Sequence, residues 1–228
     1  TSRTGISVGT GFEQKNNFFV NLELSNFYED LETSSSATDI IKKQEGNYFE
    51  NLLTYRITYN KLDQNFQPTD GFVTNFSQTL PIYSDDKSLE NSFTSSTYHS
   101  ISENLLLSAK FYLKTINSFD DNVRVSKRVN VPSRLLRGFE SGKIGPKDGN
   151  QFIGGNYATA LNLNSTLPNI LFENENIDFN LFVDVANVWE VDYNSSLDSN
   201  KIRSAAGFAV NWFSVIGPLT FSYAIPLS

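Results

Sequence analysis

The stretch LTYRITYN, residues 53–60, alternates strictly between apolar and polar side chains. The apolar positions are Leu53, Tyr55, Ile57 and Tyr59, and the positions between them are Thr54, Arg56, Thr58 and Asn60. A period of two places successive side chains on opposite faces of an extended chain, which is the signature of a β-strand with two different surroundings. The stretch therefore predicts a strand and defines the pattern to seek in the rest of the chain.

Nine further stretches show the same period of two. The clearest are residues 219–225 and 179–185; residues 6–10, 18–24, 72–80, 105–113, 157–163 and 208–212 are weaker, and residues 89–99 are the weakest. In residues 179–185, Phe182 stands among the otherwise polar positions. Helical periodicity is hard to find anywhere. We therefore expect an all-β chain of about ten antiparallel strands.

The two faces of these strands predict two different environments. The polar face carries mostly Ser, Thr, Asn, Ala and Gly, whereas a soluble sheet that faces water usually carries Lys and Glu. Small polar residues suit a wet and crowded lumen, and the Leu-, Val-, Phe- and Tyr-rich face suits either lipid or the core of a sandwich. Alternation alone leaves a transmembrane barrel and a soluble sandwich open.

Composition excludes several classes of function. The chain has 228 residues, a net charge of −7, no cysteine and one histidine, His99. The acidic balance argues against a nucleic-acid partner, and the missing thiols and the single imidazole leave little material for a disulfide framework, a metal site or a catalytic triad. The carboxylate pairs Asp85-Asp86 and Asp120-Asp121 lie in predicted loops, where solvated turns explain them best. We expect no enzyme, no metal and no cofactor.

The connections between the predicted strands also favour a barrel. Turns on one side are mostly short, whereas residues 26–47 and 116–152 form long loops on the other, as in outer-membrane barrels with short periplasmic turns. Tyr59, Trp189, Trp212 and Phe213 lie near strand ends and fit aromatic girdles. No apolar run approaches the roughly 20 residues of a membrane helix. No signal peptide precedes the first strand, so an exported form would be a mature fragment.

The longest loop contains a stretch unlike the rest, SRLLRGFESGKIGPKDG at residues 133–149, followed by IGGNYATALNLN at residues 153–164. The motif Leu136-Arg137-Gly138-Phe139, with Ile144-Gly145-Pro146 after it, resembles the signature loop of the BamA family of outer-membrane protein assembly factors. Residues 58–71, 182–189 and 202–227 resemble other parts of that family in the same order. Ala186 and Asn187 depart from the family pattern.

This resemblance implies a barrel of about sixteen antiparallel strands behind a row of POTRA domains. Residues 1–228 would then form part of one outer-membrane barrel domain, strands six to fifteen, without the POTRA domains, the first strands or the last strand. Residues 116–152 would be a long loop inserted into the lumen. An open sheet in lipid leaves edge N–H and C=O groups without partners, so we expect the ten strands to belong to a longer barrel.

The resemblance also implies a role for the arginine in the loop. In the family, this arginine reaches acidic residues on the inner wall, and a partly desolvated guanidinium requires such a partner. Asp184 lies on the polar face by parity and matches the family's acidic partner. Asn164, also inward by parity, stands where the family often has a glutamate. The expected anchor therefore joins Arg137 to Asp184, with the amide oxygen of Asn164 as a further acceptor.

The remaining motif residues receive structural expectations. Gly138 permits close backbone approach, Phe139 packs against the inner wall, and Gly145-Pro146 sets the return turn of the loop. Gly154 and Gly155 open the following strand, where a bulge, a close approach of the loop and an ordinary flexible exit are all open.

The function implied by the resemblance is to fold and insert β-barrel proteins into the outer membrane of Gram-negative bacteria. Its partners would be unfolded outer-membrane clients, accessory assembly lipoproteins and the lipid bilayer. One alternative is a TamA-like translocation factor or a two-partner secretion pore. Another is a passive diffusion barrel with an open lumen.

Overall fold

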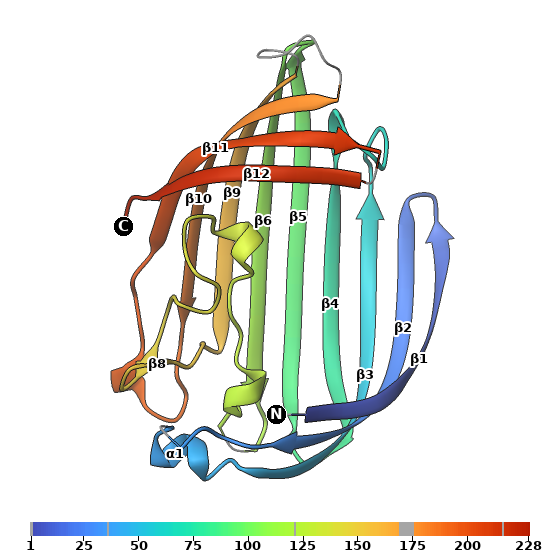
Figure 1. Ribbon diagram of the computed structural model, residues 1–228. Coiled ribbons are helices and arrows are strands. Elements are labelled where there is room, and N and C mark those ends of the chain that lie inside the picture. Colours follow the sequence, from blue (N-terminus) through green and yellow to red (C-terminus); the bar gives the residue numbers. More distant parts are fainter. Residues whose placement is uncertain (1, 36, 121, 169–175, 216) are drawn as a thin grey trace.

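The computed structural model describes residues 2–35, 37–120, 122–168, 176–215 and 217–228. Ten strands form one antiparallel sheet in the order β1-β2-β3-β4-β5-β6-β9-β10-β11-β12 (Figure 1). The strands are β1 Ser2–Lys15, β2 Phe18–Leu31, β3 Gly46–Asn60, β4 Asp70–Ser84, β5 Ser88–Ser102, β6 Leu105–Ser118, β9 Tyr157–Pro168, β10 Ile177–Trp189, β11 Arg203–Ser214 and β12 Gly217–Pro226. Every strand pairs with its neighbour along the chain, so the topology is a meander.

The short elements all lie in the connections. They are α1 Asp39–Lys42, the 3-10 helices η1 Val125–Lys127, η2 Ser133–Leu135 and η3 Ser195–Leu197, and the two-residue strands β7 Lys147–Asp148 and β8 Gln151–Phe152. Among the described residues, no helix has the length and apolar character needed to cross a membrane.

The prediction of ten antiparallel strands is confirmed, and each predicted stretch lies inside one strand of the sheet. The weak alternation at residues 89–99 has a visible cause. On β5 the face shared with Tyr55 carries Asn91, and a chain of hydrogen bonds runs from the Tyr55 hydroxyl to Gln78 Oε1 (3.0 Å) and from Gln78 Nε2 to Asn91 Oδ1 (2.6 Å). Polar side chains on the apolar face conceal the period.

The two faces of the sheet have the surroundings that the alternation predicts. The outer face exposes large apolar side chains on strand after strand, including Ile6, Val8, Leu22, Leu24, Phe111, Leu163, Leu181, Val183, Phe208, Phe221, Tyr223 and Ile225. In the described part of the chain, the second sheet is only the two-stranded β7-β8 pair, so nothing covers this face. The sandwich alternative is therefore wrong.

The inner face is tied together by hydroxyl and amide side chains. Thr54 and Thr79 lie 2.9 Å apart through their Oγ1 atoms, and the Thr58 hydroxyl donates to Asn75 Oδ1 at 2.7 Å. Such cross-strand pairs stabilise the sheet independently of apolar packing.

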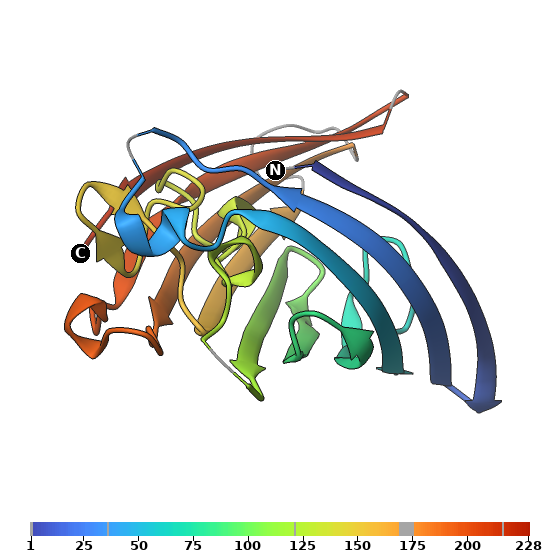
Figure 2. The same cartoon turned by 90° about the horizontal axis from the view of Figure 1, so that it is seen from below.

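The sheet does not close on itself in the described residues, and β1 and β12 form its two edges. Seen along the strands, the sheet is an open curve, and the connections with α1 and the 3-10 helices lie on its concave side (Figure 2). The concave side therefore corresponds to the polar face of the alternation.

The connection between β6 and β9 covers residues 119–156, and we call it the long connection. Its boundaries differ from the expected 116–152, because β6 continues to Ser118 and includes Ile116. Gly154 and Gly155 precede β9 instead of opening it, since β9 begins only at Tyr157. Gly155 instead forms an isolated bridge with Val129, which joins the end of the connection to its first half.

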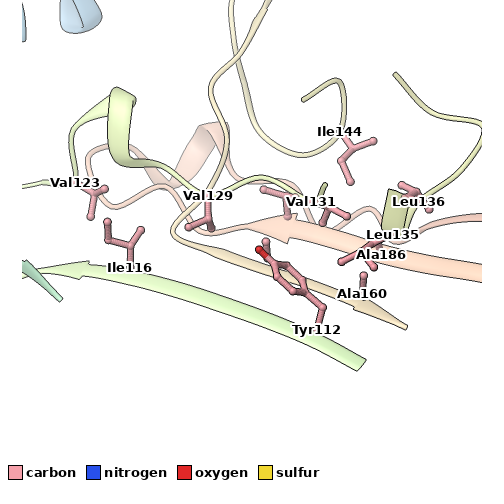
Figure 3. Packing of buried hydrophobic residues seen from close by; sticks show 12 residues of the cluster. Tyr112, Ile116, Val123, Val129, Val131, Leu135, Leu136, Ile144, Ala160 and Ala186 are labelled. Atoms are coloured by element: carbon pink, nitrogen blue, oxygen red, sulfur yellow. The ribbon is translucent and has the colours of Figure 1, made fainter. Parts of the chain in front are cut away.

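The apolar core lies between the long connection and the concave face. Val123, Val129, Val131, Leu135, Leu136 and Ile144 of the connection pack on Tyr112, Ile116, Ala158, Ala160, Ala186 and Val188 of β6, β9 and β10 (Figure 3). Alanine on the wall leaves room for the larger side chains of the connection. Small inward-facing residues of the sheet thus form one side of an apolar core, in addition to lining a wet lumen.

A second apolar cluster joins three connections at the same end of the sheet. Ala37 and Ile41 from residues 32–45 meet Ile153 of the long connection and Val191 of residues 190–202, with Val125, Tyr193 and Leu197 packed around them. The expected loop at residues 26–47 is too long, because β2 runs to Leu31 and β3 begins at Gly46. Glu29 and Asp30 made the end of β2 look like loop, although Glu29 is a buried residue of the inner face.

Three of the four aromatic residues near strand ends keep their expected place. Trp189 and Tyr157 lie with ring centroids 5.7 Å apart at one end of the sheet, and Tyr59 and Phe72 lie 5.7 Å apart near the other end. Trp212 is exposed on the outer face, whereas its neighbour Phe213 faces the opposite side and packs on Phe66 of the β3–β4 turn at 5.8 Å. The girdle assignment of Phe213 is therefore wrong.

Residues 169–175 between the predicted strands at 157–163 and 179–185 lie outside the described residues, as do Asp121 and residue 216.

Candidate functional site

Arg137 lies on the long connection immediately after η2 and Leu136. Leu135 and Leu136 are both buried in the core against the wall, which holds this segment close to the concave face. The guanidinium then reaches β10, where Asp184 is completely buried. The local sequence thus places the arginine directly after two buried leucines that hold its backbone near the wall.

The contact between Arg137 and Asp184 is bidentate. The Arg137 Nε donates to Asp184 Oδ2 at 2.8 Å, and Nη2 donates to Oδ1 at 2.7 Å. The backbone N–H of Arg137 also donates to Oδ2 at 3.0 Å, and Asn162 Nδ2 donates to Oδ1 at 2.8 Å. Each carboxylate oxygen therefore accepts two hydrogen bonds, which offsets the cost of burying the charge.

Two further side chains complete the surroundings of the guanidinium. Nη2 of Arg137 also donates to Asn164 Oδ1 at 3.0 Å. The guanidinium carbon lies 3.3 Å from the ring centroid of Phe182, in cation–π geometry. Phe182, the residue that broke the polar face of its strand, is thus part of the site. Sequence reasoning missed it, although an aromatic residue two positions before Asp184 on the inward face was the available signal.

The other motif residues pack tightly around this contact. Gly138 has φ +85°, and a Cβ there would lie 3.0 Å from the Ala224 Cβ on β12. Gly145 has φ +90°, and a Cβ there would lie 2.7 Å from the Val188 Cβ on β10. Only glycine combines a left-handed backbone with such approaches. Ile144 and Pro146 are buried next to Gly145, and Phe139 packs on the core from its edge.

Gly154 and Gly155 lie where the connection returns to the wall. A Cβ on Gly155 would lie 2.3 Å from the Trp189 carbonyl oxygen at the end of β10. Gly154 approaches the Val129 carbonyl in the same way, with a would-be Cβ contact of 2.9 Å. Of the three possibilities left open for this pair, the geometry fits close approach of the loop.

A second ion pair, which sequence reasoning missed, fastens the long connection to residues 190–202. Arg128 donates through Nη2 to Asp192 Oδ1 and through Nη1 to Asn156 Oδ1 at 3.0 Å. Asp192 also accepts from the Val123 backbone N–H at 2.7 Å. Burial raises the pKa of Asp192, but the Val123 amide, Asn156 and Arg128 outweigh burial and hold the pKa below its usual value. No sequence motif marked this pair, because its members lie 64 positions apart.

These contacts attach the long connection to the wall and to residues 190–202. The carboxylate oxygens of Asp184 are occupied by donors from the connection and from β9. Within the described ranges, no group of three or more His, Asp or Glu side chains is arranged to hold a metal ion.

Comparisons with known proteins bear on the whole chain. The family model described as the Omp85 superfamily domain matches residues 1–228. The chain is similar to the outer membrane protein assembly factor BamA of Neisseria meningitidis, with 31% identity over 120 residues, covering 40% of this chain and 15% of that protein. It is similar to BamA of Nitratidesulfovibrio vulgaris, with 24% identity over 210 residues, covering 88% of this chain and 26% of the relative.

A solved structure agrees with these relatives. The crystal structure of BamA from Haemophilus ducreyi lacking POTRA domains 1–3 superposes with a TM-score of 0.83 and 25% identity, over 99% of this chain and 51% of that one. This chain thus spans about a quarter or less of the curated relatives and about half of the solved chain. The family match extends over the full described wall, so the chain belongs to the Omp85 superfamily and is a BamA-like stretch of outer-membrane β-barrel wall.

Proposed function

We propose that this chain is part of the barrel of an assembly factor that folds and inserts β-barrel proteins into the outer membrane of a Gram-negative bacterium. Its clients would be unfolded outer-membrane proteins, and accessory lipoproteins would assist it. Assembly of this kind forms hydrogen bonds between strands and requires no covalent step, so no enzymatic activity is proposed.

The observation that carries the proposal is the combination of wall and loop. The outer face exposes Leu, Val, Phe and Tyr side chains along successive strands, as a lipid-facing wall requires. On the other face, Arg137 fixes the long connection to Asp184 across the concave side. A barrel whose wall is braced from within can keep its shape while strands elsewhere in the barrel separate and pair with a client by β-augmentation.

A passive diffusion barrel fits these observations less well. The long connection packs an apolar core onto β6, β9 and β10, so it occupies space that a conducting channel would leave to water. A TamA-like translocation factor or a two-partner secretion pore would share the lipid-facing wall and the braced loop. Only a measurement of client insertion or partner secretion distinguishes these from an assembly factor.

The test uses the full-length protein in liposomes and an unfolded outer-membrane β-barrel protein as client. We expect the protein to accelerate client insertion, measured as the appearance of folded, protease-resistant client over time, relative to protein-free liposomes. Arg137→Ala should lower the rate. Arg134→Ala, an exposed arginine of the same connection, should leave it unchanged.

The alternatives predict different outcomes in the same liposomes. A large and steady conductance without acceleration of insertion would support a diffusion barrel and contradict the proposal. Release of a secreted partner into the liposomes, without insertion of the client, would support a secretion pore and contradict it equally.

A further inference from the structure

Arg124 is another arginine of the long connection, and like Arg128 it is buried. It directly precedes η1, and its side chain is 6% exposed. Three carboxylates from three different elements surround its guanidinium, namely Glu29 on β2, Glu50 on β3 and Asp86 in the β4–β5 turn. No motif in the sequence marked this cluster, which we call the Arg124 cluster.

The contacts of the guanidinium are directional. Nε donates to Asp86 Oδ2 at 2.7 Å, and Nη2 donates to Glu50 Oε1. Nη1 lies 3.2 Å from Glu29 Oε2 but out of line for a hydrogen bond, so this third contact is an ion pair only. The guanidinium carbon also lies 3.7 Å from the ring centroid of Tyr48. A fork with its two arms on different carboxylates and a ring beneath it suits arginine and not lysine.

The charges of the Arg124 cluster balance only if the long connection is in place. Nζ of Lys127 on η1 lies 2.7 Å from Glu50 Oε1, and Nη2 of Arg3 on β1 lies 3.3 Å from Glu50 Oε2. Three carboxylates thus face three cations, two of which belong to the connection. The Glu50 side chain is 1% exposed and the Asp86 side chain 8%, so the expectation of a solvated turn residue is wrong for Asp86. Buried carboxylates without these cations would carry an uncompensated desolvation cost.

Besides the contact of Arg128 with Asp192, two ion-pair contacts hold the connection to parts of the sheet that are far apart. Arg124 binds β2, β3 and the β4–β5 turn, whereas Arg137 binds Asp184 on β10 and Asn164 on β9. In the sheet order, β3 and β9 are separated by β4, β5 and β6. Between the two arginines, Val129, Val131 and Leu135 pack on the wall and give the segment a defined path.

We propose that Arg124 is a second positioning residue of the long connection, and that the connection is a tie between two parts of the wall. One part is β2–β4 with the β4–β5 turn, and the other is β9–β10. The tie sets the distance between these parts. This distance in turn fixes how strongly the sheet curves around its concave side (Figure 2). This inference concerns the wall itself, goes beyond the proposed function and does not rest on it.

A tie makes a prediction that two local attachments do not. If the connection transmits force from one part of the wall to the other, releasing either end releases the whole tie. Losing both ends then has the effect of losing one. If each arginine only stabilises its own surroundings, the effects of the two losses are separate and add.

The experiment measures the distance between the two parts in the full-length protein reconstituted in lipid. Spin labels are attached to Tyr28→Cys on β2 and Val183→Cys on β10, both exposed on the outer face, and the present chain contributes no other cysteine. Pulsed electron–electron double resonance gives the distribution of distances between the two spin labels. The four backgrounds are unchanged protein, Arg124→Ala, Arg137→Ala and both substitutions together.

We expect Arg124→Ala and Arg137→Ala each to broaden the distribution and the double variant to match either single variant. Arg134→Ala, the exposed control on the same connection, should leave the distribution unchanged. Arg124→Lys retains the charge but not the fork, so it should restore the narrow distribution only in part. A purely local role of Arg124 would not alter the distance between β2 and β10.

Two outcomes overturn the proposal. In the first, Arg124→Ala loosens the backbone around residues 123–127, seen as faster amide hydrogen exchange, while the distance distribution stays as in Arg134→Ala. In the second, the double variant broadens by the sum of the single effects. If Arg124→Ala does not fold, Asp86→Asn removes one arm of the fork with little change in shape and replaces it in the same four-way comparison.

Discussion

The contact between Arg137 and Asp184 allows a quantitative test. Arg137→Ala removes three side-chain hydrogen bonds, two to Asp184 and one to Asn164. Asp184 stays buried and keeps donors only from the backbone N–H of residue 137 and from Asn162. Removing one member of a buried ion pair typically costs about 3–5 kcal/mol. The two remaining donors place Arg137→Ala near the lower end, about 3 kcal/mol of unfolding free energy.

The partner substitution leaves a different residue unpaired. After Asp184→Ala, the guanidinium keeps Asn164 and the Phe182 ring, and its side chain is 19% exposed to water. We expect a similar loss of about 3 kcal/mol, because all four hydrogen bonds to the carboxylate disappear, two of them from the guanidinium. In the double variant neither group remains unpaired, so its loss should fall short of the sum by about 2 kcal/mol.

Equilibrium unfolding in urea, followed by tryptophan fluorescence of the full-length protein in lipid, measures all four states. Arg134→Ala is the matched control and should change the unfolding free energy by less than about 0.5 kcal/mol. If the two single losses add to the double loss within about 0.5 kcal/mol, the two residues do not interact and the reasoning fails.

Three further predictions follow from other contacts. Gly145→Ala should lower the unfolding free energy more than Gly142→Ala, by about 1–3 kcal/mol in a urea titration. Both glycines have a positive φ, but only a Cβ on Gly145 would meet Val188. Equal losses in the two variants would refute the packing argument. The depressed pKa of Asp192 contributes stability above its unfolded pKa of about 3.9 that is lost as the pH falls further. Protease resistance of the long connection should therefore drop below about pH 4, and Asp192→Asn should reduce that drop; an unchanged acid transition in the variant would contradict it. Val183→Arg at the centre of β10 should cost about 2–4 kcal/mol in a lipid bilayer, whereas Ser222→Arg on the inner face of β12 should cost less; a reversed order would mean that the faces are assigned wrongly.

Much of the wall could be read from the order of residues. Alternation of two is a consequence of covalent backbone geometry and needs no distant partner, so residues 53–60 revealed both the strand and its faces. It failed where the outer face carries hydrogen-bonded polar side chains, as at Asn91 on β5. It also failed at the end of β2, where the buried Glu29 resembles a loop residue.

The candidate site was accessible only in part. The resemblance of residues 136–146 to a known motif, together with the parity of β10, singled out Arg137, Asp184 and Asn164, and the structure brings these three side chains together. Phe182 was visible in the sequence only as an exception to the pattern. Its position under the guanidinium explains the exception, since a cation–π contact needs an aromatic ring on the inward face.

By itself, the sequence determined the all-β class, the ten strands, their two faces and the arginine motif, because each of these depends on neighbours along the chain or on one contiguous stretch. Apart from the contact between Arg137 and Asp184, only the tertiary structure decided which charges meet. Arg124 finds Glu50 and Asp86 at separations of 74 and 38 positions, and Arg128 finds Asp192 at 64. Such partners are selected by the curvature of the sheet and by the path of the long connection over it, and electrostatic attraction acts through space without regard to distance along the chain.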